Sequence, residues 1–389
     1  MKYNFDKPIN RCGTNSYKWD SADADIIPLW VADMDFSTAP EITEALQRRA
    51  AHGIFGYVRV PDSYYNALIS WFKRRHNWSI NRESIIYTTG VVPAISAIIE
   101  AITVPGDKVL IQTPVYNCFF SSIRNYKCSA VENELVYDDS TYSIDFEDFE
   151  AKASDPSVKA FLLCNPHNPA GRVWTRNELK RMGDICLKHN VFVIADEIHC
   201  ELTLPGFSYT PFASLDHNYA NNCAVCTSPS KAFNIAGLQI ANIIISNPDI
   251  YKAVNHAINV NEVCDVNPFG VDAMIAAYNY GEPWIDELNC YISANYIFLT
   301  LFIAKNIPQL KVCALEGTYL AWIDISATGM DCNYLADRLK TEARVWLNAG
   351  TMYGRNGKDF LRINLACPQS TLAEGLKRIN NWLNINGKL

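Results

Sequence analysis

Long apolar runs and a surplus of basic charge are both missing from this sequence. No apolar run approaches the roughly 18 residues that a membrane span needs, and the opening Met-Lys-Tyr-Asn-Phe-Asp has no apolar core of the signal-peptide kind. Acidic residues number 41 against 34 basic ones, which gives a net charge of −7. That balance gives no electrostatic reason to expect nucleic acid or an anionic membrane as a partner. We therefore expect neither partner and predict a cytoplasmic protein.

Paired cysteine motifs and clustered histidines, which are common zinc ligands, are equally scarce. The 13 cysteines are scattered and odd in number, and Cys164 lies inside an apolar run, where a free thiol packs as a small hydrophobe. Cys223 and Cys226 form a CxxC, which opens a redox or zinc interpretation, but no second CxxC and no histidine cluster accompany them. We interpret the pair as core residues of a strand and expect no metal site. Unpaired thiols are typical of a reducing cytoplasm.

What the sequence does contain is the pattern of a two-domain α/β protein. A chain of 389 residues with 49% apolar and 19% charged residues can bury a large core. Nearly continuous apolar runs alternate with longer amphipathic segments, as in a parallel sheet covered by helices on both faces. The pattern predicts strands over 85–89, 108–112, 160–164, 191–195, 224–227 and 240–246, with helices after Gly90 and over 176–189. The expected fold class is α/β with a three-layer, mostly parallel sheet.

The character of the sequence changes near Glu282. A long segment of helix formers is followed by short strands expected over 319–325 and 360–366 and by a last helix over 372–383. We interpret residues 282–389 as a smaller α+β domain, 46–281 as the large domain, and 1–45 as an N-terminal segment that packs with the small domain.

Four groups of candidate ligand-binding residues fall at predicted strand ends, where open α/β sheets bind ligands. Gly90-Val91-Val92 starts a helix whose backbone N–H groups suit a phosphate, although a glycine there is also explained as a turn residue. Residues 165–171 contain two Asn-Pro steps, which favour a rigid loop that accommodates cis bonds and aims the amides of Asn165 and Asn168 into a cleft. An ordinary turn is the alternative for this loop.

Two charged residues complete the set. Asp196 ends the apolar run Val-Phe-Val-Ile-Ala, where a carboxylate needs a cation or hydrogen-bond donors. A protonated pyridine nitrogen would serve, and a helix N-cap is an equal alternative. Lys231 follows Ser228 and Ser230 between apolar flanks, which argues against a free surface lysine. Its amine could bind an aldehyde covalently while the hydroxyls contact a phosphate.

The order glycine turn, Asn-Pro loop, Asp, Lys resembles the fold-type I pyridoxal-phosphate (PLP) enzymes, the aspartate aminotransferase superfamily, over nearly the whole chain. The resemblance is closer still to the MalY/PatB-type cystathionine β-lyases, which include bacterial cysteine desulfhydrases. The segments that carry it are 28–36 (Pro-Leu-Trp-Val-Ala-Asp-Met-Asp-Phe), 55–57 (Phe-Gly-Tyr), 195–199 (Ala-Asp-Glu-Ile-His), 230–239 (Ser-Lys-Ala-Phe-Asn-Ile-Ala-Gly-Leu-Gln) and 316–319 (Glu-Gly-Thr-Tyr). The resemblance implies PLP as the cofactor, bound by the large domain.

The resemblance also assigns roles to matching positions. Lys231 would hold PLP covalently and act as the catalytic base, with Tyr116 stacked on the ring as a second catalytic group. The other cofactor contacts would come from Asp196 at the ring nitrogen, Asn168 and His199 at the ring hydroxyl, and Gly90, Val91, Val92, Ser228, Ser230 and Tyr57 near the phosphate. Arg362 would bind the substrate α-carboxylate as a bidentate fork, supported by Asn165 and Tyr57. Because Tyr57 would act across a subunit boundary, the resemblance implies a homodimer with shared active sites.

Three departures from related enzymes bear on the reaction. Many aminotransferases carry an arginine eight residues after the lysine, where this chain has Gln239. The lyase subgroup lacks that arginine too, so the change favours a lyase. Asn117 follows Tyr116 where some relatives have a second tyrosine, which leaves open the group that assists the leaving thiol. His199 stands where aspartate aminotransferase has a tyrosine.

The predicted function is a PLP-dependent C–S β-lyase that cleaves cystathionine or cysteine-type amino acids to pyruvate, ammonia and a thiol. An aminotransferase needs the same lysine, aspartate and arginine, so it stays the main alternative. Some members of the subgroup also bind a transcription regulator, which makes an interaction protein a second alternative, and a non-enzymatic binding protein is a third. The residues leave the preferred thiol or thioether open.

Overall fold

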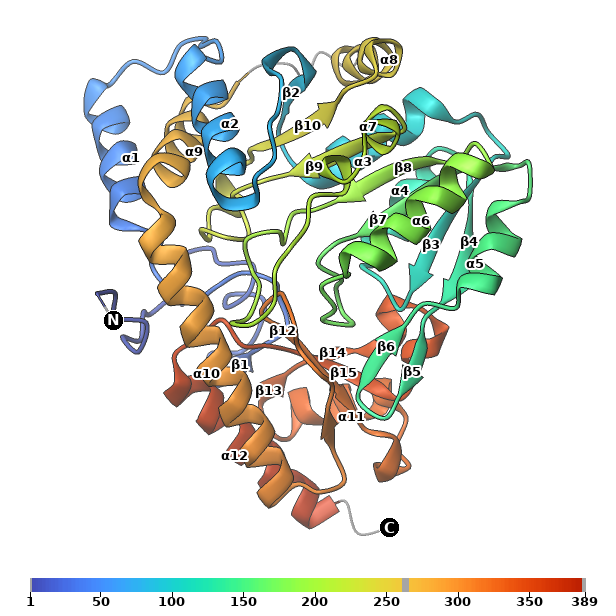
Figure 1. The fold of residues 1–389 in the computed structure, drawn as a ribbon. Coiled ribbons are helices and arrows are strands. Elements are labelled where there is room, and N and C mark those ends of the chain that lie inside the picture. Colours follow the sequence, from blue (N-terminus) through green and yellow to red (C-terminus); the bar gives the residue numbers. More distant parts are fainter. Residues whose placement is uncertain (1, 261–265, 387–389) are drawn as a thin grey trace.

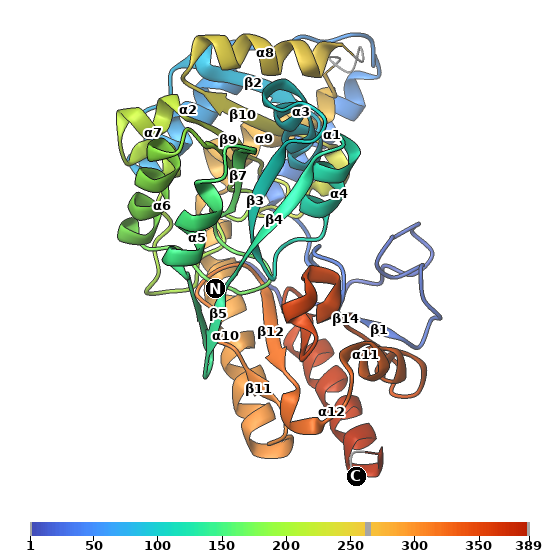
Figure 2. The same cartoon turned by 90° about the vertical axis from the view of Figure 1, so that its right-hand side faces the viewer.

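The computed structural model describes residues 2–260 and 266–386 and contains two main sheets of different size (Figures 1 and 2). The larger has seven strands in the order β2-β10-β9-β8-β7-β3-β4. These strands are β2 (Ile85–Thr88), β3 (Lys108–Thr113), β4 (Ser129–Glu134), β7 (Val158–Cys164), β8 (Phe192–Asp196), β9 (Cys223–Thr227) and β10 (Ala241–Ile245). Neighbouring strands from β4 to β9 are parallel, whereas β10 is antiparallel to both β2 and β9. The predicted mostly parallel α/β sheet is confirmed.

Helices cover both faces of the large sheet, because most of its strands are apolar on both faces. One face packs in a single core cluster with α3 (Val91–Ile102), α4 (Cys118–Asn125) and α8 (Pro248–Asn259). The other face packs with α2 (Asp62–His76), α5 (Phe146–Ala153), α6 (Arg176–Lys188), α7 (His217–Asn221) and α9 (Pro268–Tyr280), and α1 (Pro40–His52) packs on α9. Helix α6 begins where the sequence predicts it, because Thr175 and Glu178 form a capping box at its first turn.

The smaller sheet is antiparallel and lies below the larger one in Figure 1. Its strands are β11 (Lys311–Val312), β12 (Leu320–Asp324), β15 (Phe360–Asn364) and β14 (Asn348–Ala349), in that order, and helices α10 (Glu282–Asn306), α11 (Cys332–Thr341) and α12 (Gln369–Asn386) accompany it. The N-terminal chain reaches this part, since β1 (Ile27–Pro28) pairs in parallel with β13 (Val345–Trp346). A hairpin of β5 (Val136–Asp138) and β6 (Thr141–Ser143) extends from the large-sheet part towards it. The domain boundaries after residues 45 and 281 stay a proposal.

Helix α10 is long and rich in apolar residues, although the sequence contains no apolar run of about 18 residues. It has 25 residues and reaches a mean hydropathy of 1.2, so by length and composition it could cross a membrane, although its apolar residues do not form one run. Polar residues interrupt the apolar residues of α10, which is why this long apolar helix contains no long apolar run. Asn295 is buried and donates hydrogen bonds to the carbonyl oxygens of Leu365 (2.9 Å) and Cys367 (2.9 Å). A core helix of a globular domain passes the same composition test, and we interpret α10 as one.

The carboxyl ends of five strands meet at one edge of the large sheet. Strands β3, β7, β8 and β9 are parallel, and β2 runs the same way because β10 pairs antiparallel with both β2 and β9. Residues that follow these strands therefore gather at a common edge. They are Gly90 after β2, Tyr116 after β3, Asn168 after β7, His199 after β8 and Lys231 after β9.

The turn over Gly350–Tyr353, which borders this edge, has no room for a larger residue at its start. A Cβ on Gly350 would lie 2.0 Å from the carbonyl oxygen of Gly357 and 2.6 Å from that of Phe360. We expect Gly350→Ala to lower the free energy of unfolding by about 2 kcal/mol, because overpacking a filled site costs roughly 1–3 kcal/mol. Urea unfolding measures the change. Gly237→Ala is the control, since an added Cβ there meets nothing within 4 Å, and equal midpoints for the two variants would contradict the packing.

Candidate active site

A cavity of about 590 Å³ opens at the edge where the strand ends meet. Residues of the large-sheet part form one side of it. Asn348, Tyr353 and Arg362, from the small-sheet part, form another, and the N-terminal chain contributes Tyr17 and residues 30–32. Ten residues predicted from the sequence line this cavity: Gly90, Val91, Val92, Tyr116, Asn168, Asp196, His199, Ser230, Lys231 and Arg362. The structure thus brings ten of the predicted residues together around one cavity, and their roles towards a cofactor or a substrate stay predictions.

Three predicted residues lie outside the lining of the cavity. The hydroxyl of Ser228 donates to the carbonyl oxygen of Ile240 (2.5 Å) and accepts from the N–H of Ser230 (3.0 Å). Ser228 therefore holds the main chain of Ser230, which does line the cavity. Asn165 is fully buried, and its amide donates to the carbonyl oxygen of Thr210 (3.2 Å). Tyr57 is 94% exposed. Their predicted ligand contacts stay proposals.

Asp196 is a buried carboxylate with few donors around it. It ends β8 at 4% exposure, beside Cys164 on β7 and Cys226 on β9. Its Oδ1 accepts from the N–H of Ile198 (3.1 Å), and no other donor among the described residues reaches it. Burial raises the pKa of this carboxyl to about 7. A carboxylate in such a place has room for a cationic partner from the cavity.

His199 lines the cavity one turn after Asp196 and is also incompletely bonded. Its ring packs edge-on against Tyr319, with 6.0 Å between ring centroids. Burial lowers the pKa of His199 to about 3, so the ring is neutral at physiological pH. Its Nδ1 is buried and has no hydrogen-bond partner within residues 2–260 and 266–386. A ring oxygen of a bound cofactor is a suitable partner for that nitrogen.

The amine of Lys231 points at the N-terminal segment. Its Nζ donates to the carbonyl oxygen of Ala32 (2.7 Å), which also accepts from the hydroxyl of Tyr319 (2.9 Å). Burial lowers the pKa of Lys231, and the carboxylates of Asp33 and Asp196 oppose that shift. A lowered pKa increases the fraction of neutral amine, which is the form that attacks an aldehyde or removes a proton.

Arg362 reaches the cavity from the middle strand pair of the small sheet. Its Nη1 donates to Oδ1 of Asn168 (3.1 Å) and its Nη2 to the carbonyl oxygen of Trp30 (2.8 Å). The guanidinium lies over the ring of Tyr353, 4.8 Å from its centroid. The Nε atom is buried and has no partner among the residues described. An arginine held this way keeps donors available for a carboxylate.

The first turn of α3 supplies backbone donors. The N–H groups in the first turn of any helix have no intrahelical acceptor, and at this helix the first-turn residues Val91 and Val92 line the cavity. Gly90 precedes them with φ of −179°, which any residue adopts. Its lack of a side chain is therefore useful for close approach of a ligand and is not needed for the turn. Ser230 lines the same cavity, and the positive end of the helix dipole suits a phosphate.

Several cavity residues were missed from the sequence. Trp30 stacks on Trp346, with ring centroids 4.1 Å apart, and Asn348 donates to the carbonyl oxygen of Trp30 (3.0 Å) and to the hydroxyl of Tyr353 (3.0 Å). Trp30 lies inside the segment 28–36 that resembles the lyase subgroup. That resemblance was the feature of the sequence that could have indicated Trp30 as a cavity residue. Cys118, at the start of α4, carried no signal beyond its closeness to Tyr116 in sequence.

These features fit PLP. A lysine amine with lowered pKa suits its aldehyde, the incompletely bonded Asp196 suits a protonated ring nitrogen, and the start of α3 suits its phosphate. The fold and the site together define a fold-type I PLP-dependent enzyme.

The comparison with known families agrees with this class. The model of the aminotransferase class I and II family matches residues 24–379. The chain therefore belongs to the aminotransferase class I and II family.

Individual relatives narrow the comparison. The chain is 44% identical over 383 residues to the cystathionine β-lyase PatB of Bacillus subtilis (strain 168). This match covers 97% of the present chain and 98% of PatB. The crystal structure of cystalysin from Treponema denticola, which contains a PLP cofactor, matches with a TM-score of 0.96 and 38% identity over 99% of this chain and all (100%) of that one. The PLP-bound C–S lyase from Staphylococcus hominis matches with a TM-score of 0.93 and 34% identity over the same shares, 99% and 100%. The predicted family, fold class and cofactor are confirmed.

The buried carboxylate of Asp196 gives the cofactor-free protein a pH dependence. Because folding raises its pKa from 3.8 to about 7, the folded state holds a proton that the unfolded state releases. Its contribution to stability is complete below the unfolded pKa and is lost as the pH rises through 7. We expect Asp196→Asn to remove that part of the decline, roughly 3–4 kcal/mol between pH 4 and 7.

Urea unfolding of the cofactor-free protein at several pH values measures the slope. Asp337→Asn, on the exposed side of α11, is the matched control and keeps the wild-type slope. An unchanged slope in Asp196→Asn would show that this carboxyl is not the proton-binding group.

Proposed function

We propose that this chain is a PLP-dependent C–S β-lyase that cleaves cystathionine or cysteine-type amino acids by α,β-elimination. The products are pyruvate, ammonia and a thiol. The observation that carries the proposal is one cavity in which Lys231, Asp196 and Arg362 meet, in a chain whose full-length relatives include a cystathionine β-lyase and a C–S lyase. When bound, PLP supplies an aldehyde that takes up the substrate amino group and a cationic ring that accepts negative charge from Cα.

Arg362 orients the substrate in this proposal. Asn168 and the carbonyl oxygen of Trp30 hold its two Nη atoms, so the plane of the guanidinium is fixed before substrate arrives. A fixed arginine binds a carboxylate with little loss of side-chain entropy. The α-carboxylate is then held while the Cα–H bond faces the base. Asn168, whose Oδ1 is engaged by Arg362, keeps its NH₂ group as a donor for the ring oxygen.

Lys231 is the base. Its burial lowers the pKa of the amine, so a larger fraction is neutral and able to take the proton from Cα. The carbonyl oxygen of Ala32 accepts from its Nζ at 2.7 Å and keeps the free amine in the cavity. Asp196 would hold the ring nitrogen of the cofactor protonated, and a cationic ring would accept negative charge from Cα.

Tyr116 assists the leaving group. Burial raises the pKa of this phenol, so it stays protonated and can donate to the sulfur as the Cβ–S bond breaks. A thiolate is a good leaving group, so modest assistance is enough. Gln239, at the position where many aminotransferases have arginine, is exposed and does not line the cavity. The cavity thus receives no cation from that position, which favours the lyase over the aminotransferase.

A homodimer with shared active sites completes the proposal. Ile54, Phe55 and Tyr57 are 70%, 57% and 94% exposed, which is unusual for three neighbouring apolar side chains. Phe55 stacks on Phe269 with 5.7 Å between centroids, so the segment is held in place while its apolar surface faces outward. A second subunit would cover this surface, and Tyr57 would reach the phosphate end of the neighbouring cavity.

We place the enzyme in the cytoplasm, as a soluble protein whose ligands are the cofactor and a small amino acid. Twelve cysteines, all free, lie in the described parts of the chain, and free thiols in this number suit a reducing compartment.

Pyruvate formation tests the reaction. Purified enzyme loaded with PLP and given cystathionine, with no keto acid, should release pyruvate, and Lys231→Ala should lower the rate by about 10³-fold or more, because base catalysis contributes 10²–10⁴-fold. Lactate dehydrogenase and NADH report the pyruvate. Turnover that appears only after a keto acid is added would assign the enzyme to the aminotransferases instead. Cysteine, cystine and alanine in parallel rank the thiol and thioether substrates.

The dimer proposal makes a separate prediction at Tyr57. Tyr57→Phe should keep the dimer but weaken PLP binding about 10- to 150-fold, because one hydrogen bond to a charged phosphate contributes roughly 1.5–3 kcal/mol. Light scattering gives the mass and titration of the visible absorbance gives the PLP affinity. Tyr334→Phe, on the exposed side of α11, is the matched control. A monomer in solution, or unchanged PLP affinity in Tyr57→Phe, would remove the shared-site arrangement.

A further inference from the structure

The N-terminal segment 30–36 is built into the active site through its main chain. It has no helix or strand of its own, yet its carbonyl oxygens accept hydrogen bonds from side chains of the cavity. Trp30 accepts from Arg362 (2.8 Å), and Ala32 accepts from Lys231 (2.7 Å). The side chain of Asn364 donates to the carbonyl oxygens of the two residues that flank Ala32, which are Val31 (2.6 Å) and Asp33 (2.6 Å). A segment without secondary structure thus holds the two cations on which the proposed reaction depends.

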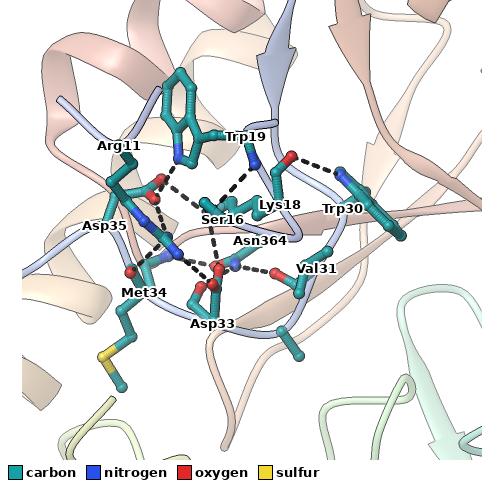
Figure 3. A network of polar contacts seen from close by, with 12 residues as sticks. Arg11, Ser16, Lys18, Trp19, Trp30, Val31, Asp33, Met34, Asp35 and Asn364 are labelled. Carbon is teal, nitrogen blue, oxygen red and sulfur yellow. Dashed lines mark hydrogen bonds and ion pairs between the residues drawn. The ribbon is translucent and has the colours of Figure 1, made fainter. Parts of the chain in front are cut away.

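The side chains of the same segment form a charge cluster with Arg11 and Lys18, in which Lys18 and Asp35 are buried and Arg11 and Asp33 are partly exposed (Figure 3). Asp35 is 4% exposed and accepts from Arg11 (2.7 Å), Lys18 (2.8 Å) and the indole N–H of Trp19 (2.8 Å). Asp33 pairs with Arg11 at 2.7 Å and with Lys18 at 3.5 Å. Lys18 is fully buried. Two cations and two carboxylates balance one another, which is what permits a lysine to be buried at all.

None of the four cluster residues lines the active-site cavity. Residues 30–32 line the active-site cavity, whereas residues 33–36 and Arg11 line a second cavity of about 300 Å³. Lys18 and Asp35 therefore have no direct contact with a ligand in the active-site cavity, and their link to it runs through segment 30–36 and through Asp33, whose charge acts on Lys231.

We propose that the cluster of Arg11, Lys18, Asp33 and Asp35 fixes segment 30–36 in register, and that Lys18 and Asp35 are positioning residues for Arg362 and Lys231. This inference rests on the proposed function only for the identity of the substrate. Buried ion pairs contribute little net stability, and in some proteins they select one arrangement of the chain, which is the role proposed here. Here the selected arrangement places the carbonyl oxygens of Trp30 and Ala32 against the carboxylate-binding arginine and the catalytic lysine. Loss of the cluster frees the segment to shift, and Arg362 loses its fixed plane.

Lys18→Met tests the proposal, since methionine fills similar space without charge. We expect KM for the amino-acid substrate to rise about 10- to 100-fold, because a shift of about 1 Å in a positioning group costs up to about 100-fold. The rise in KM should exceed the fall in kcat, and Lys18→Arg should restore most of the loss. Lys108→Met, which breaks an exposed ion pair with Asp155 (2.7 Å), is the matched control and keeps wild-type values.

Hydrogen exchange of the PLP-loaded enzyme gives a readout independent of turnover. Amides of residues 30–36 should exchange faster in Lys18→Met, while those of the large sheet keep wild-type protection. Trp19→Phe, which removes a single donor from Asp35, should move both readouts in the same direction by a smaller amount, and it carries the test where Lys18→Met fails to fold. Wild-type KM with wild-type exchange in a folded variant would overturn the proposal. Absence of pyruvate from the wild-type enzyme would sink the lyase assignment alone, because the exchange measurement does not depend on the substrate.

Discussion

A carboxylate buried with too few donors is the constraint from which the rest of this structure follows. Asp196 can be tolerated at the end of β8 because something cationic can approach it from the cavity. The parallel strands on either side bring the Asn-Pro loop and Lys231 to the same edge. The second sheet then supplies Arg362 from across the cavity. In the proposed function, the large sheet supplies the carboxylate that would face the cofactor ring nitrogen, and the small sheet supplies the arginine that would bind the substrate carboxylate.

The large sheet was predictable because its strands are buried on both faces. Continuous apolar runs gave β7, β8, β9 and β10 to within one or two residues. The strand that escaped prediction is β4 (Ser129–Glu134), which lies at the sheet edge and carries polar side chains that no apolar run marks. The antiparallel direction of β10 also escaped, because apolar content does not encode strand direction.

The chemistry of the site was predictable where a residue is out of place by ordinary rules. A carboxylate after five apolar residues and a lysine between apolar flanks are such cases, and both line the cavity. The positions of Ser228 and Asn165, one layer behind the lining, could not be obtained from strand ends alone, because a one-residue difference decides which side chain faces the ligand. The N-terminal wall was the hardest part of the site to predict, because its contacts join residues far apart in the sequence. Trp30 and Arg362 are 332 positions apart, and Ala32 and Lys231 are 199 apart.

That separation has a consequence for how the enzyme is made. Lys231 is synthesised before β15 (Phe360–Asn364). Trp30 and Val31 are synthesised 332 and 333 residues before their partners Arg362 and Asn364. The large sheet can form earlier from segments closer in sequence, since nascent domains fold from the N-terminal side onward. The contacts that β15 makes with segment 30–36 can therefore form only after β15 has been made. Cofactor binding in the geometry proposed above therefore requires a chain that already includes β15.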